Sequence, residues 1–253
     1  MGYSKDIEIK AGDACYYFKY LEWDTAFFDK ESYLLDPEKS TLTVSAAMKG
    51  MMEETFKNRF ITVKLASDYP RELLDFLQSS GFRYIDTEVT LRYSKTLQDK
   101  ASTDGNIKII KLEENKDLLY QELGSAFSLT RFHYDVHIRS DKADLLWIQY
   151  IKNYRPSPTS HMFVARLNDE TTGTILVNEN KENKTAVLFF VSVLEKFRDK
   201  KVGSALIKHV VRYFDSYELT TETQIRNIKA INFYIRNGFS LLAATKTVLH
   251  RWS

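Results

Sequence analysis

One stretch of the sequence limits the fold more than any other. Residues 186–193, Ala-Val-Leu-Phe-Phe-Val-Ser-Val, form an almost continuous apolar run, and a short basic turn separates them from residues 204–214. In the second segment Leu206, Val210 and Phe214 recur at helical spacing. A continuous apolar run indicates a strand buried on both faces, and the spacing indicates an amphipathic helix. Together they predict a mixed α/β fold with a covered sheet.

Strand-like and helix-like segments alternate on both sides of a polar break. Residues 95–106 contain one large apolar residue and include the turn dipeptide Asp104-Gly105, so we expect a linker there. This predicts one domain over 1–94 and another over 107–253. The predicted strands are 14–21, 60–66, 82–93, 161–167, 173–177 and 186–193, and the predicted helices are 43–56, 71–79, 118–129, 142–154 and 204–214.

The two halves of the chain end alike. Residues 233–239, Phe-Tyr-Ile-Arg-Asn-Gly-Phe, align without gaps with residues 76–82, Phe-Leu-Gln-Ser-Ser-Gly-Phe. In both places a Gly-Phe pair follows a predicted helix and precedes a predicted strand, and glycine is the residue that most often ends a helix in the left-handed conformation. The echo falls at corresponding places in the two halves, so it favours a duplicated α/β unit over chance similarity.

Composition excludes several classes of protein. With 13% aromatic residues the chain is not typical of a disordered protein. The 36 Lys and Arg residues against 34 Asp and Glu leave a net charge of +2, so no overall field favours nucleic acid or an anionic membrane. The single cysteine, Cys15, excludes an intrachain disulfide and a cysteine-based zinc cluster. The sequence shows no long apolar segment and no signal-like start, so we expect a soluble, cytoplasmic protein.

The turn after the buried strand carries the main functional signal. Arg198, Lys200 and Lys201 place positive charge there, and Gly203 permits a close approach of the backbone. A strand–turn–helix presents unpaired backbone N–H groups and the positive end of the helix dipole at one point, which suits a phosphate. Taken alone, the turn also fits an ordinary strand–helix connection with a solvated basic surface.

A second motif makes the turn more specific. Residues 227–239 are Asn-Ile-Lys-Ala-Ile-Asn-Phe-Tyr-Ile-Arg-Asn-Gly-Phe. Together with the Arg198-x-x-Lys201-x-Gly203 turn, they resemble the acetyl-CoA signature of the GNAT acetyltransferases, over about residues 107–253. That family usually has Gly where Lys201 stands here, and often where Asp199 stands. The resemblance implies a central mixed, mostly antiparallel sheet and acetyl-CoA as co-substrate. The departure at Lys201 leaves open a degenerate CoA-binding protein that interacts with a partner.

The first half of the chain adds a closer resemblance. Residues 21–28, 77–89 and 126–132 are similar to segments of the bacterial TDP-fucosamine acetyltransferases. Those enzymes have a reduced GNAT-like first domain and N-acetylate a TDP-4-amino-4,6-dideoxy sugar. The resemblance implies a reduced N-terminal unit without a CoA turn, a complete C-terminal unit, a homodimer, and a nucleotide-linked amino sugar for surface polysaccharide as acceptor. A GNAT enzyme for another small amine or for a peptide N-terminus stays open.

The resemblance also implies roles for individual residues. Tyr234 is expected to protonate the CoA sulfur as a general acid. Backbone amides near Val191 and Val193 would hold the pantetheine arm and the thioester carbonyl. Arg131 and Phe132 would bind the diphosphate and a ring of the acceptor. The residues expected to bind the co-substrate are Val191, Val193, Arg198, Asp199, Lys200, Lys201, Val202, Gly203, Ser204, Asn227 and Asn232.

The general base is left open by the sequence. The candidates are Glu88, Asp135, His133 and His161, and a relay of water molecules would serve equally. His133 and His137 have the spacing of two metal ligands on one helix face, but nothing supplies a third ligand at a usual spacing. We therefore expect no metal.

Overall fold

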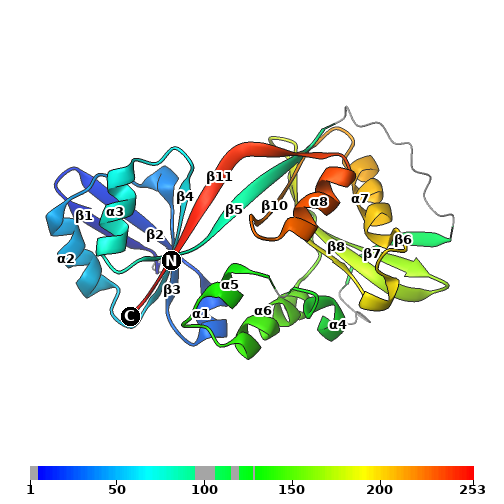
Figure 1. The fold of residues 1–253 in the computed structure, drawn as a ribbon, viewed down its shortest axis with the longest axis horizontal. Coiled ribbons are helices and arrows are strands. Elements are labelled where there is room, and N and C mark those ends of the chain that lie inside the picture. Colours follow the sequence, from blue (N-terminus) through cyan, green and yellow to red (C-terminus); the bar gives the residue numbers. More distant parts are fainter. Residues whose placement is uncertain (1–4, 95–105, 115–119, 128) are drawn as a thin grey trace. The chain divides into compact units, whose positions relative to one another are not determined.

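The computed structural model describes residues 5–94, 106–114, 120–127 and 129–253 and has a mixed α/β fold (Figure 1). The predicted fold class is therefore confirmed. The chain forms two compact units: unit 1 is Met1–Glu88 with Ala244–Ser253, and unit 2 is Val89–Ala243. The predicted linker lies outside the described residues except for Asn106. The predicted domain boundaries divide the linear chain and stay a prediction.

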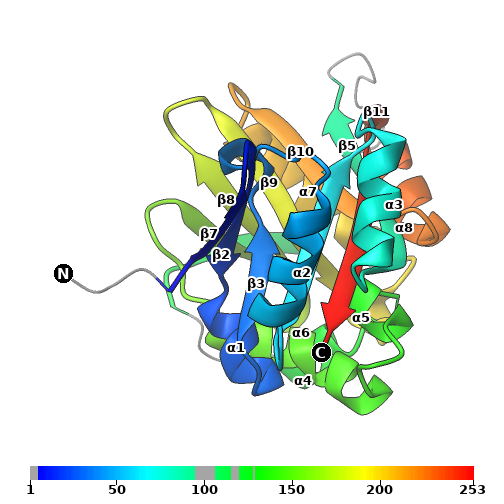
Figure 2. The same cartoon turned by 90° about the vertical axis from the view of Figure 1, so that its left-hand side faces the viewer.

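Unit 1 is built on strands in the order β1-β2-β3-β4-β11. Its elements are β1 (Ile7–Ala11), β2 (Ala14–Tyr20), α1 (Glu22–Phe28), β3 (Ser32–Leu35), the 3₁₀ turn η1 (Pro37–Lys39), α2 (Ala46–Thr55), β4 (Phe60–Ala66), α3 (Arg71–Ser79) and the first part of β5 (Arg83–Tyr93). The β3–β4 pair is parallel, and the other pairs of this order are antiparallel. Helices α2 and α3 cover one face of the sheet (Figure 2), where apolar side chains such as Met52, Leu77 and Val63 form the core.

Unit 2 has strands in the order β11-β5-β10-β9-β8-β7-β6. Its elements are β6 (Ile107–Leu112), α4 (Tyr120–Gly124), α5 (Arg131–Tyr134), α6 (Ser140–Asn153), β7 (Ser160–Leu167), β8 (Glu170–Asn180), β9 (Thr185–Val193), the 3₁₀ turn η2 (Glu195–Phe197), α7 (Val202–Tyr213), β10 (Glu218–Gln224), α8 (Ile228–Arg236) and β11 (Phe239–Trp252). Strands β6 to β9 are antiparallel neighbours, whereas β9 and β10 are parallel.

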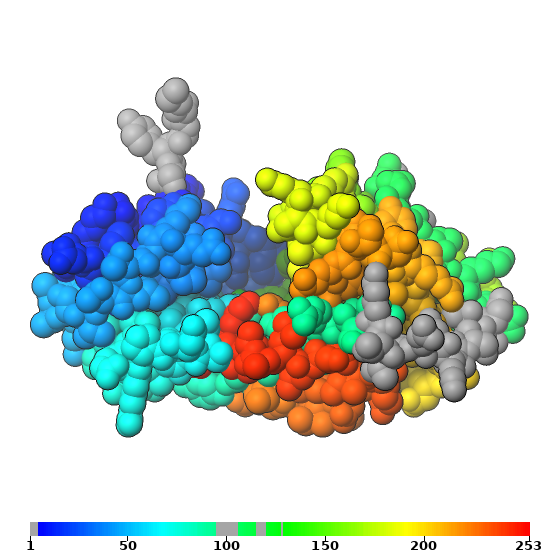
Figure 3. Space-filling model, turned by 90° about the horizontal axis from the view of Figure 1, so that it is seen from above, coloured from blue at the N-terminus to red at the C-terminus, as the bar shows by residue number. Residues whose placement is uncertain are grey.

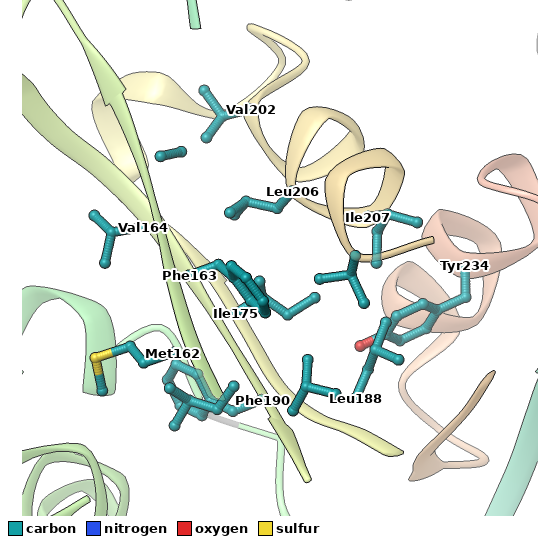
Figure 4. Close-up of a cluster of buried hydrophobic side chains, with 14 of the residues drawn as sticks. Met162, Phe163, Val164, Ile175, Leu188, Phe190, Val202, Leu206, Ile207 and Tyr234 are labelled. Carbon is teal, nitrogen blue, oxygen red and sulfur yellow. The ribbon is translucent and has the colours of Figure 1, made fainter. Parts of the chain in front are cut away.

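The core of unit 2 lies between the sheet and its helices. Leu206 and Ile207 point from α7 towards the strands, and Tyr234 enters the same cluster from α8 (Figure 4). The opposite face is covered by α6, whose Trp147 ring lies 5.7 Å from that of Phe190. Among the helices of the described segments, none is long and apolar enough to cross a membrane.

Each of the two long strands that follow a Gly-Phe pair belongs to both units. Strand β5 begins in unit 1 and joins unit 2 from Val89, whereas β11 begins in unit 2 and joins unit 1 from Ala244. The first half of β11 reaches the surface, where its red atoms are visible in Figure 3. Gly81 and Gly238 have φ angles of 87° and 89° after α3 and α8, so the predicted helix-ending glycines are confirmed.

Sequence patterns locate the long amphipathic elements and miss the short or polar ones. Helices α2, α3, α6 and α7 lie within a few residues of their predictions. The helix expected over 118–129 is helical at Tyr120–Gly124, and residues 115–119 and 128 lie outside the described part of the chain. Strand β3 has only four residues, and β10 is mostly Thr, Glu and Gln, so neither has an apolar pattern strong enough to predict it.

Candidate functional site

The two parallel strands of unit 2 separate part of the way along. Their register runs from Glu218 paired with Thr185 to Thr221 paired with Leu188. Strand β9 continues through residues 189–193 after the last pair, and β10 continues through residues 222–224. We call these two diverging segments the fork. On this edge the backbone groups of β9 are not used by the ladder with β10, so they can bind a ligand.

A β-bulge lies where the fork begins. Leu188 pairs with Val177 and Phe190 with Leu176, so Phe189 is the extra residue in β9. As a result two successive phenylalanines face α6 and its C-terminal end: the Phe189 ring lies 5.8 Å from that of Tyr150, and the Phe190 ring lies 5.7 Å from that of Trp147. Bulges of this kind bend a strand and end its pairing, which gives a physical reason for the divergence of β9 from β10.

The N-terminus of α7 follows directly after the fork. The first hydrogen bond of the α-helical pattern runs from the Ala205 amide to the Lys201 carbonyl, at 2.9 Å. The amides of Val202, Gly203 and Ser204 precede it and are among the donors that a helix leaves without internal partners. Within the described residues, the N-cap residue Lys201 adds no side-chain hydrogen bond to this helix end. The helix therefore presents amide donors and its positive dipole end where β9 ends.

Two residues of the turn have a backbone conformation that favours glycine. Asp199 has a φ of 63° and Lys201 a φ of 61°, both in the left-handed region. For a residue with a Cβ this conformation costs about 1–2 kcal/mol. In the family that this turn resembles, glycine usually stands at the position of Lys201 and often at that of Asp199. The chain keeps the backbone path of the turn, at a cost in stability.

The predicted cations lie at the surface of the turn. Arg198 and Lys200 are exposed. The Arg198 Nη1 lies 3.8 Å from Glu195 Oε1, an exposed ion pair that contributes little to stability. The Lys200 Nζ lies 5.1 Å from the centroid of the Phe197 ring. Both cations can therefore turn towards an anion at the α7 N-terminus without loss of core packing.

Gly203 and Asn227 join the turn to α8. A Cβ at Gly203 would lie 3.0 Å from two atoms of the Phe233 ring and 3.5 Å from Val193 Cγ2. The space that the missing side chain leaves is thus occupied by α8 and β9. The Asn227 side chain accepts a hydrogen bond from the Ala230 amide at 3.2 Å and caps α8. The end of β9, the start of α7 and α8 therefore form one packed group.

Tyr234 is buried at the base of the fork. Its side chain is 7% exposed, and its ring lies 5.3 Å from Phe233 and 5.5 Å from Phe239. Burial raises the pKa of Tyr234, and a hydrogen bond with the Thr221 hydroxyl lowers it. Thr221 belongs to the last β9–β10 pair and donates to the Leu188 carbonyl at 2.7 Å. The phenol is therefore a protonated acid at neutral pH, positioned where the strands separate.

The predicted acceptor residues lie on the short helix α5. The Arg131 Cζ lies 4.5 Å from the centroid of the Phe132 ring, and Phe132 is buried. The Arg226 Cζ lies 4.0 Å from the centroid of the Tyr134 ring. Arg226 stands two residues after the end of β10, so α5 lies against the loop at the open end of the fork. Asn232, in contrast, is an exposed residue of α8.

The candidate bases have structural partners. Glu88 forms an ion pair with Lys64 at 2.9 Å within unit 1. His133 Nε2 lies 3.0 Å from Asp144 Oδ1, and Asp135 accepts a hydrogen bond from the His137 amide at 3.0 Å. These contacts hold the helices and turns of their own units and single out none of these groups as a base.

His161 lies at the start of β7, below the C-terminal end of α7. Its ring lies 5.4 Å from that of Phe214 and 5.8 Å from that of Tyr213. Its Nε2 atom lies 3.5 Å from Glu179 Oε2, and both side chains are nearly buried. Burial lowers the pKa of His161, and the Glu179 charge opposes that effect. In the part of the chain that the structure describes, no group of three His, Cys, Asp or Glu side chains could hold a metal ion.

Sequence reasoning missed Thr221 and Arg226. Both depend on β10, whose polar sequence was not recognised as a strand. The available signal was alternation, because Leu219, Thr221 and Thr223 are buried while Glu218 and Glu222 are exposed. A Thr-rich alternating segment between two predicted helices could have indicated a strand.

Comparison with known proteins finds one family model that resembles this part of the chain. Residues 118–239 match the model of the acetyltransferase (GNAT) family. No curated protein sequence matches the chain significantly.

Solved structures resemble the chain over almost its whole length. A conserved protein of unknown function from Staphylococcus epidermidis aligns with a TM-score of 0.65 at 15% identity and covers 99% of this chain and 96% of its own. A GCN5-related N-acetyltransferase from Sphaerobacter thermophilus aligns with a TM-score of 0.63 at 13% identity, over 94% of this chain and 76% of its own. A tandem GNAT protein from the clavulanic acid biosynthesis pathway aligns with a TM-score of 0.57 at 12% identity, over 96% of this chain and 81% of its own. At these identities the likeness shows a shared fold.

Proposed function

We propose that the chain, whose residues 118–239 match the model of the acetyltransferase (GNAT) family, is an acyltransferase of that family and transfers an acetyl group from acetyl-CoA to an amine. One observation carries the proposal. The fork, the uncapped N-terminus of α7 and the buried Tyr234 hydroxyl lie at successive points of one packed group in unit 2. That arrangement offers donors for a carbonyl, donors for a phosphate and an acid at the base of the fork.

The residues present fit the co-substrate. The amides of residues 202–204 suit a pyrophosphate because they are unpaired within the helix and stand at its positive end. Arg198, Lys200 and Lys201 add charge at the surface of the same turn. The edge of β9 after Leu188 can bind an extended amide-bearing arm by strand-like hydrogen bonds. Asp199 is the one charge in the turn that opposes a phosphate.

The chemistry assigns a task to each group. Acetyl-CoA, when bound, supplies a thioester. Amides at residues 191–193 would orient its carbonyl and stabilise the charge that develops on the oxygen. The Tyr234 hydroxyl would give its proton to the departing sulfur, for which its raised pKa keeps it protonated. A water relay would remove the proton that the acceptor ammonium must lose, since the candidate bases are held by structural contacts.

We extend the proposal to a nucleotide-linked amino sugar as the acceptor. The support is the resemblance of the first half and the two guanidinium groups near the open end of the fork, Arg131 and Arg226. Guanidinium groups suit a diphosphate, whereas a polyamine or an aminoglycoside would need carboxylates. The cytoplasmic location, the homodimer and the role in surface polysaccharide belong to the same proposal and rest on the resemblance alone.

Calorimetric titration tests the proposal directly. The protein is titrated first with acetyl-CoA and then with a TDP-4-amino-4,6-dideoxyhexose. Binding of both is expected. Binding of acetyl-CoA alone would remove the acceptor and keep the acyltransferase. Binding of neither would mean that Asp199 and Lys201 close the turn, and would favour a degenerate protein that interacts with a partner.

Tyr234→Phe tests the acid. The variant keeps the buried ring and loses the hydroxyl, so kcat should fall by about 10²-fold or more while acetyl-CoA binding is retained. Tyr154→Phe is the matched control, because Tyr154 is also buried and its hydroxyl donates to the His161 carbonyl at 3.3 Å. Unchanged turnover in Tyr234→Phe would exclude Tyr234 as the acid.

A further inference from the structure

We propose that the outer face of α8 is a docking surface for an acidic acyl carrier protein, which brings an acetyl thioester to the fork on its phosphopantetheine arm. The inference rests on the proposed function and names a second donor for it. Its basis is the contrast between this face and the face of the corresponding helix of unit 1. The outer face consists of the exposed residues of the helix, Ile228, Lys229, Asn232, Ile235 and Arg236.

Helix α3 of unit 1 shows what an ordinary solvated face looks like on this framework. The alignment of the two Gly-Phe ends places α3 on α8, with Arg71 at the position of Ile228. The two helices expose corresponding positions, which in α3 are Arg71, Glu72, Asp75, Gln78 and Ser79. All five residues are polar, and the Arg71 Nε lies 4.0 Å from Asp75 Oδ2. The face of α3 therefore carries charges of both signs and no apolar side chain.

The same positions of α8 are apolar or basic. Ile228 is 58% exposed and Ile235 is 43% exposed, and Lys229 and Arg236 stand beside them on the helix. Residues 228–236 contain no Asp or Glu, so the face has a charge of +2. The one Arg, one Glu and one Asp of the α3 face give it a charge of −1. On a shared framework, α8 thus has exposed isoleucines and the opposite charge.

These features select one kind of partner. Residues seven apart lie on one stripe of a helix, so a partner helix can contact Ile228 and Ile235 together. The charge of +2 favours an acidic partner. In a symmetric dimer through this face, the cations of one α8 would lie against those of the other and repel them. Recognition of an anionic membrane typically uses about four to eight Lys or Arg, whereas the face has two. It therefore fits an acidic amphipathic helix of another protein.

The position of α8 links such a partner to the site. A Cβ on Gly203 would lie 3.0 Å from the Phe233 ring, so α8 packs directly on the helix end that suits a phosphate. Phe233 is the neighbour of Asn232, a residue of the outer face. A helix with its side chains is about 10–12 Å across, and a phosphopantetheine arm is longer than that. A carrier docked on α8 can therefore place its phosphate at the amides of residues 202–204 and its thioester in the fork.

The turn itself favours the arm of a carrier. CoA and an acyl carrier share the arm and the thioester, but CoA adds a pyrophosphate and a nucleotide, whereas the carrier arm ends in one phosphodiester. Asp199 and Lys201 each place a Cβ in the turn, and Asp199 adds a negative charge. A single phosphodiester carries less charge into this turn than a pyrophosphate does. The reaction is unchanged: the carbon–nitrogen bond forms, the carbon–sulfur bond breaks, water takes a proton from the acceptor nitrogen, and the carrier leaves as a thiol after its sulfur receives a proton.

The first measurement compares three donors with the wild-type protein. They are an acetylated bacterial acyl carrier protein, acetyl-CoA, and acetyl-phosphopantetheine as the detached arm. Each is tested with a TDP-4-amino-4,6-dideoxyhexose, spermidine and kanamycin, and the acceptor with the highest kcat/KM is kept. Docking predicts that kcat/KM for the carrier exceeds that for the detached arm by about tenfold or more, and that salt reduces this advantage. Equal values for the carrier and the detached arm would overturn the inference.

An exchange of faces locates the docking surface. A variant with Ile228→Arg, Lys229→Glu, Ile235→Gln and Arg236→Ser gives α8 the residues of α3 at four exposed positions. It should lose the advantage of the carrier, while kcat/KM for the detached arm stays within about twofold. Lys229→Glu alone should reduce the advantage about threefold, and this single variant decides the outcome if the fourfold variant does not fold. An advantage that Lys229→Glu leaves intact would contradict docking on this face.

Arg71→Ile with Glu72→Lys is the matched control, because it makes the reverse change on α3. It should leave the advantage of the carrier unchanged. An equal loss in this control would show a general effect of surface charge and overturn the inference. Binding of the wild type, but not of the fourfold variant, to phosphatidylglycerol vesicles without any advantage of the carrier would identify a membrane surface and overturn it as well.

The wild-type measurements separate this inference from the proposed function. Transfer from acetyl-CoA with no advantage of the carrier over the detached arm would overturn only the docking surface. Failure of all three donors with every acceptor would overturn the proposed function and the inference together.

Discussion

The two units contain the same order of elements, and they differ in the backbone pairing and the charge of the segment that follows the first strand of that order. In unit 1 the order is β3, η1, α2, β4, α3, Gly-Phe and β5, and in unit 2 it is β9, η2, α7, β10, α8, Gly-Phe and β11. The first and second strands of each set pair in parallel. Comparison of the two sets therefore separates what the fold requires from what the site requires.

In unit 1 the backbone after β3 is already paired. The Asp36 carboxylate accepts from the Glu38 amide at 3.1 Å, and the Asp36 amide donates to the Tyr17 carbonyl at 2.9 Å. The Thr41 amide donates to the Cys15 carbonyl at 2.7 Å. Strand β2 and one acidic side chain thus use the donors that follow the strand.

In unit 2 the corresponding edge of the strand is not paired with its parallel neighbour. Strand β9 continues through residues 189–193 after its last pair with β10, whereas β3 continues only to Leu35 after its last pair at Leu34. The turn that follows β9 carries Arg198, Lys200 and Lys201 where unit 1 carries Asp36. The comparison indicates that two differences create the candidate site on the shared order of elements: the strand pairing of β9 with β10 stops early, and the charge of the following turn is positive and not negative.

The largest expected effect comes from adding one methyl group to equivalent helices. Gly203→Ala in α7 should lower the free energy of unfolding by about 1–2 kcal/mol, because its Cβ would meet the Phe233 ring at 3.0 Å. Gly50→Ala in α2 should raise it by about 0.5–1 kcal/mol, because nothing lies within 4 Å and alanine is the better helix former. Urea unfolding measures both. A change in the free energy of unfolding with the same sign in both variants would contradict the view that α8 packs on Gly203.

Relief of backbone strain gives a smaller effect. Lys201→Gly should raise the free energy of unfolding by about 0.5–1 kcal/mol, because the Cβ of lysine makes a φ of 61° sterically unfavourable. Asn58→Gly is the matched change in unit 1, where φ is 56°, and should be nearly neutral because asparagine tolerates this conformation. Thermal unfolding of both variants checks the difference. A loss of stability in Lys201→Gly would show that the side chain stabilises the turn.

The smallest expected effect is a pH dependence that arises from two histidines of unit 2. Burial lowers the pKa of His161 and of His209, which α7 carries. The ordinary pKa of histidine, which applies to the unfolded chain, is 6.5. As the pH falls, the unfolded chain therefore binds protons at these histidines before the folded protein does. Their contribution to stability is therefore present above pH 6.5 and is lost below it, by less than about 1.4 kcal/mol per pH unit for each histidine.

Hydrogen exchange locates this effect. Between pH 7.5 and 5.5, protection corrected for intrinsic rates should fall more in α7 than in α2, which packs Met48 and Met52 on its own sheet. His161→Gln should reduce the fall in α7. An equal fall in both helices, unaffected by the substitution, would show that other groups control the acid response.

The parts of the fold that the sequence predicts are those with local causes. A strand that is buried on both faces, such as β9, has a continuous apolar sequence. A helix that is buried on one face, such as α7, has apolar residues at every third or fourth position, so each pattern indicates its element. The helix-ending conformation at Gly81 and Gly238 follows from the freedom of glycine. The mixed α/β class, the acyltransferase activity and the GNAT resemblance of the second half were therefore predictable from short segments.

The parts that escaped prediction depend on long-range pairing. Strand β10 is polar, and only its neighbours β5 and β9 make it a strand. In the helix expected over 118–129, the described helical residues end at Gly124, where α4 packs closely against α6: a Cβ on Gly124 would lie 2.7 Å from the Ile148 backbone. The roles of the individual site residues stay predictions, to be tested by the variants above.

The sequence by itself determined a strand, a basic turn and a helix at residues 186–214, and a helix ending in Gly-Phe within residues 227–239. Only the tertiary structure decided that β9 and β10 separate after Leu188 and Thr221, and that Tyr234 is buried in the cluster that contains Leu188. The reason is physical: local propensity fixes an element, but the end of a β-ladder depends on a bulge against β8 and on helices packed on both faces.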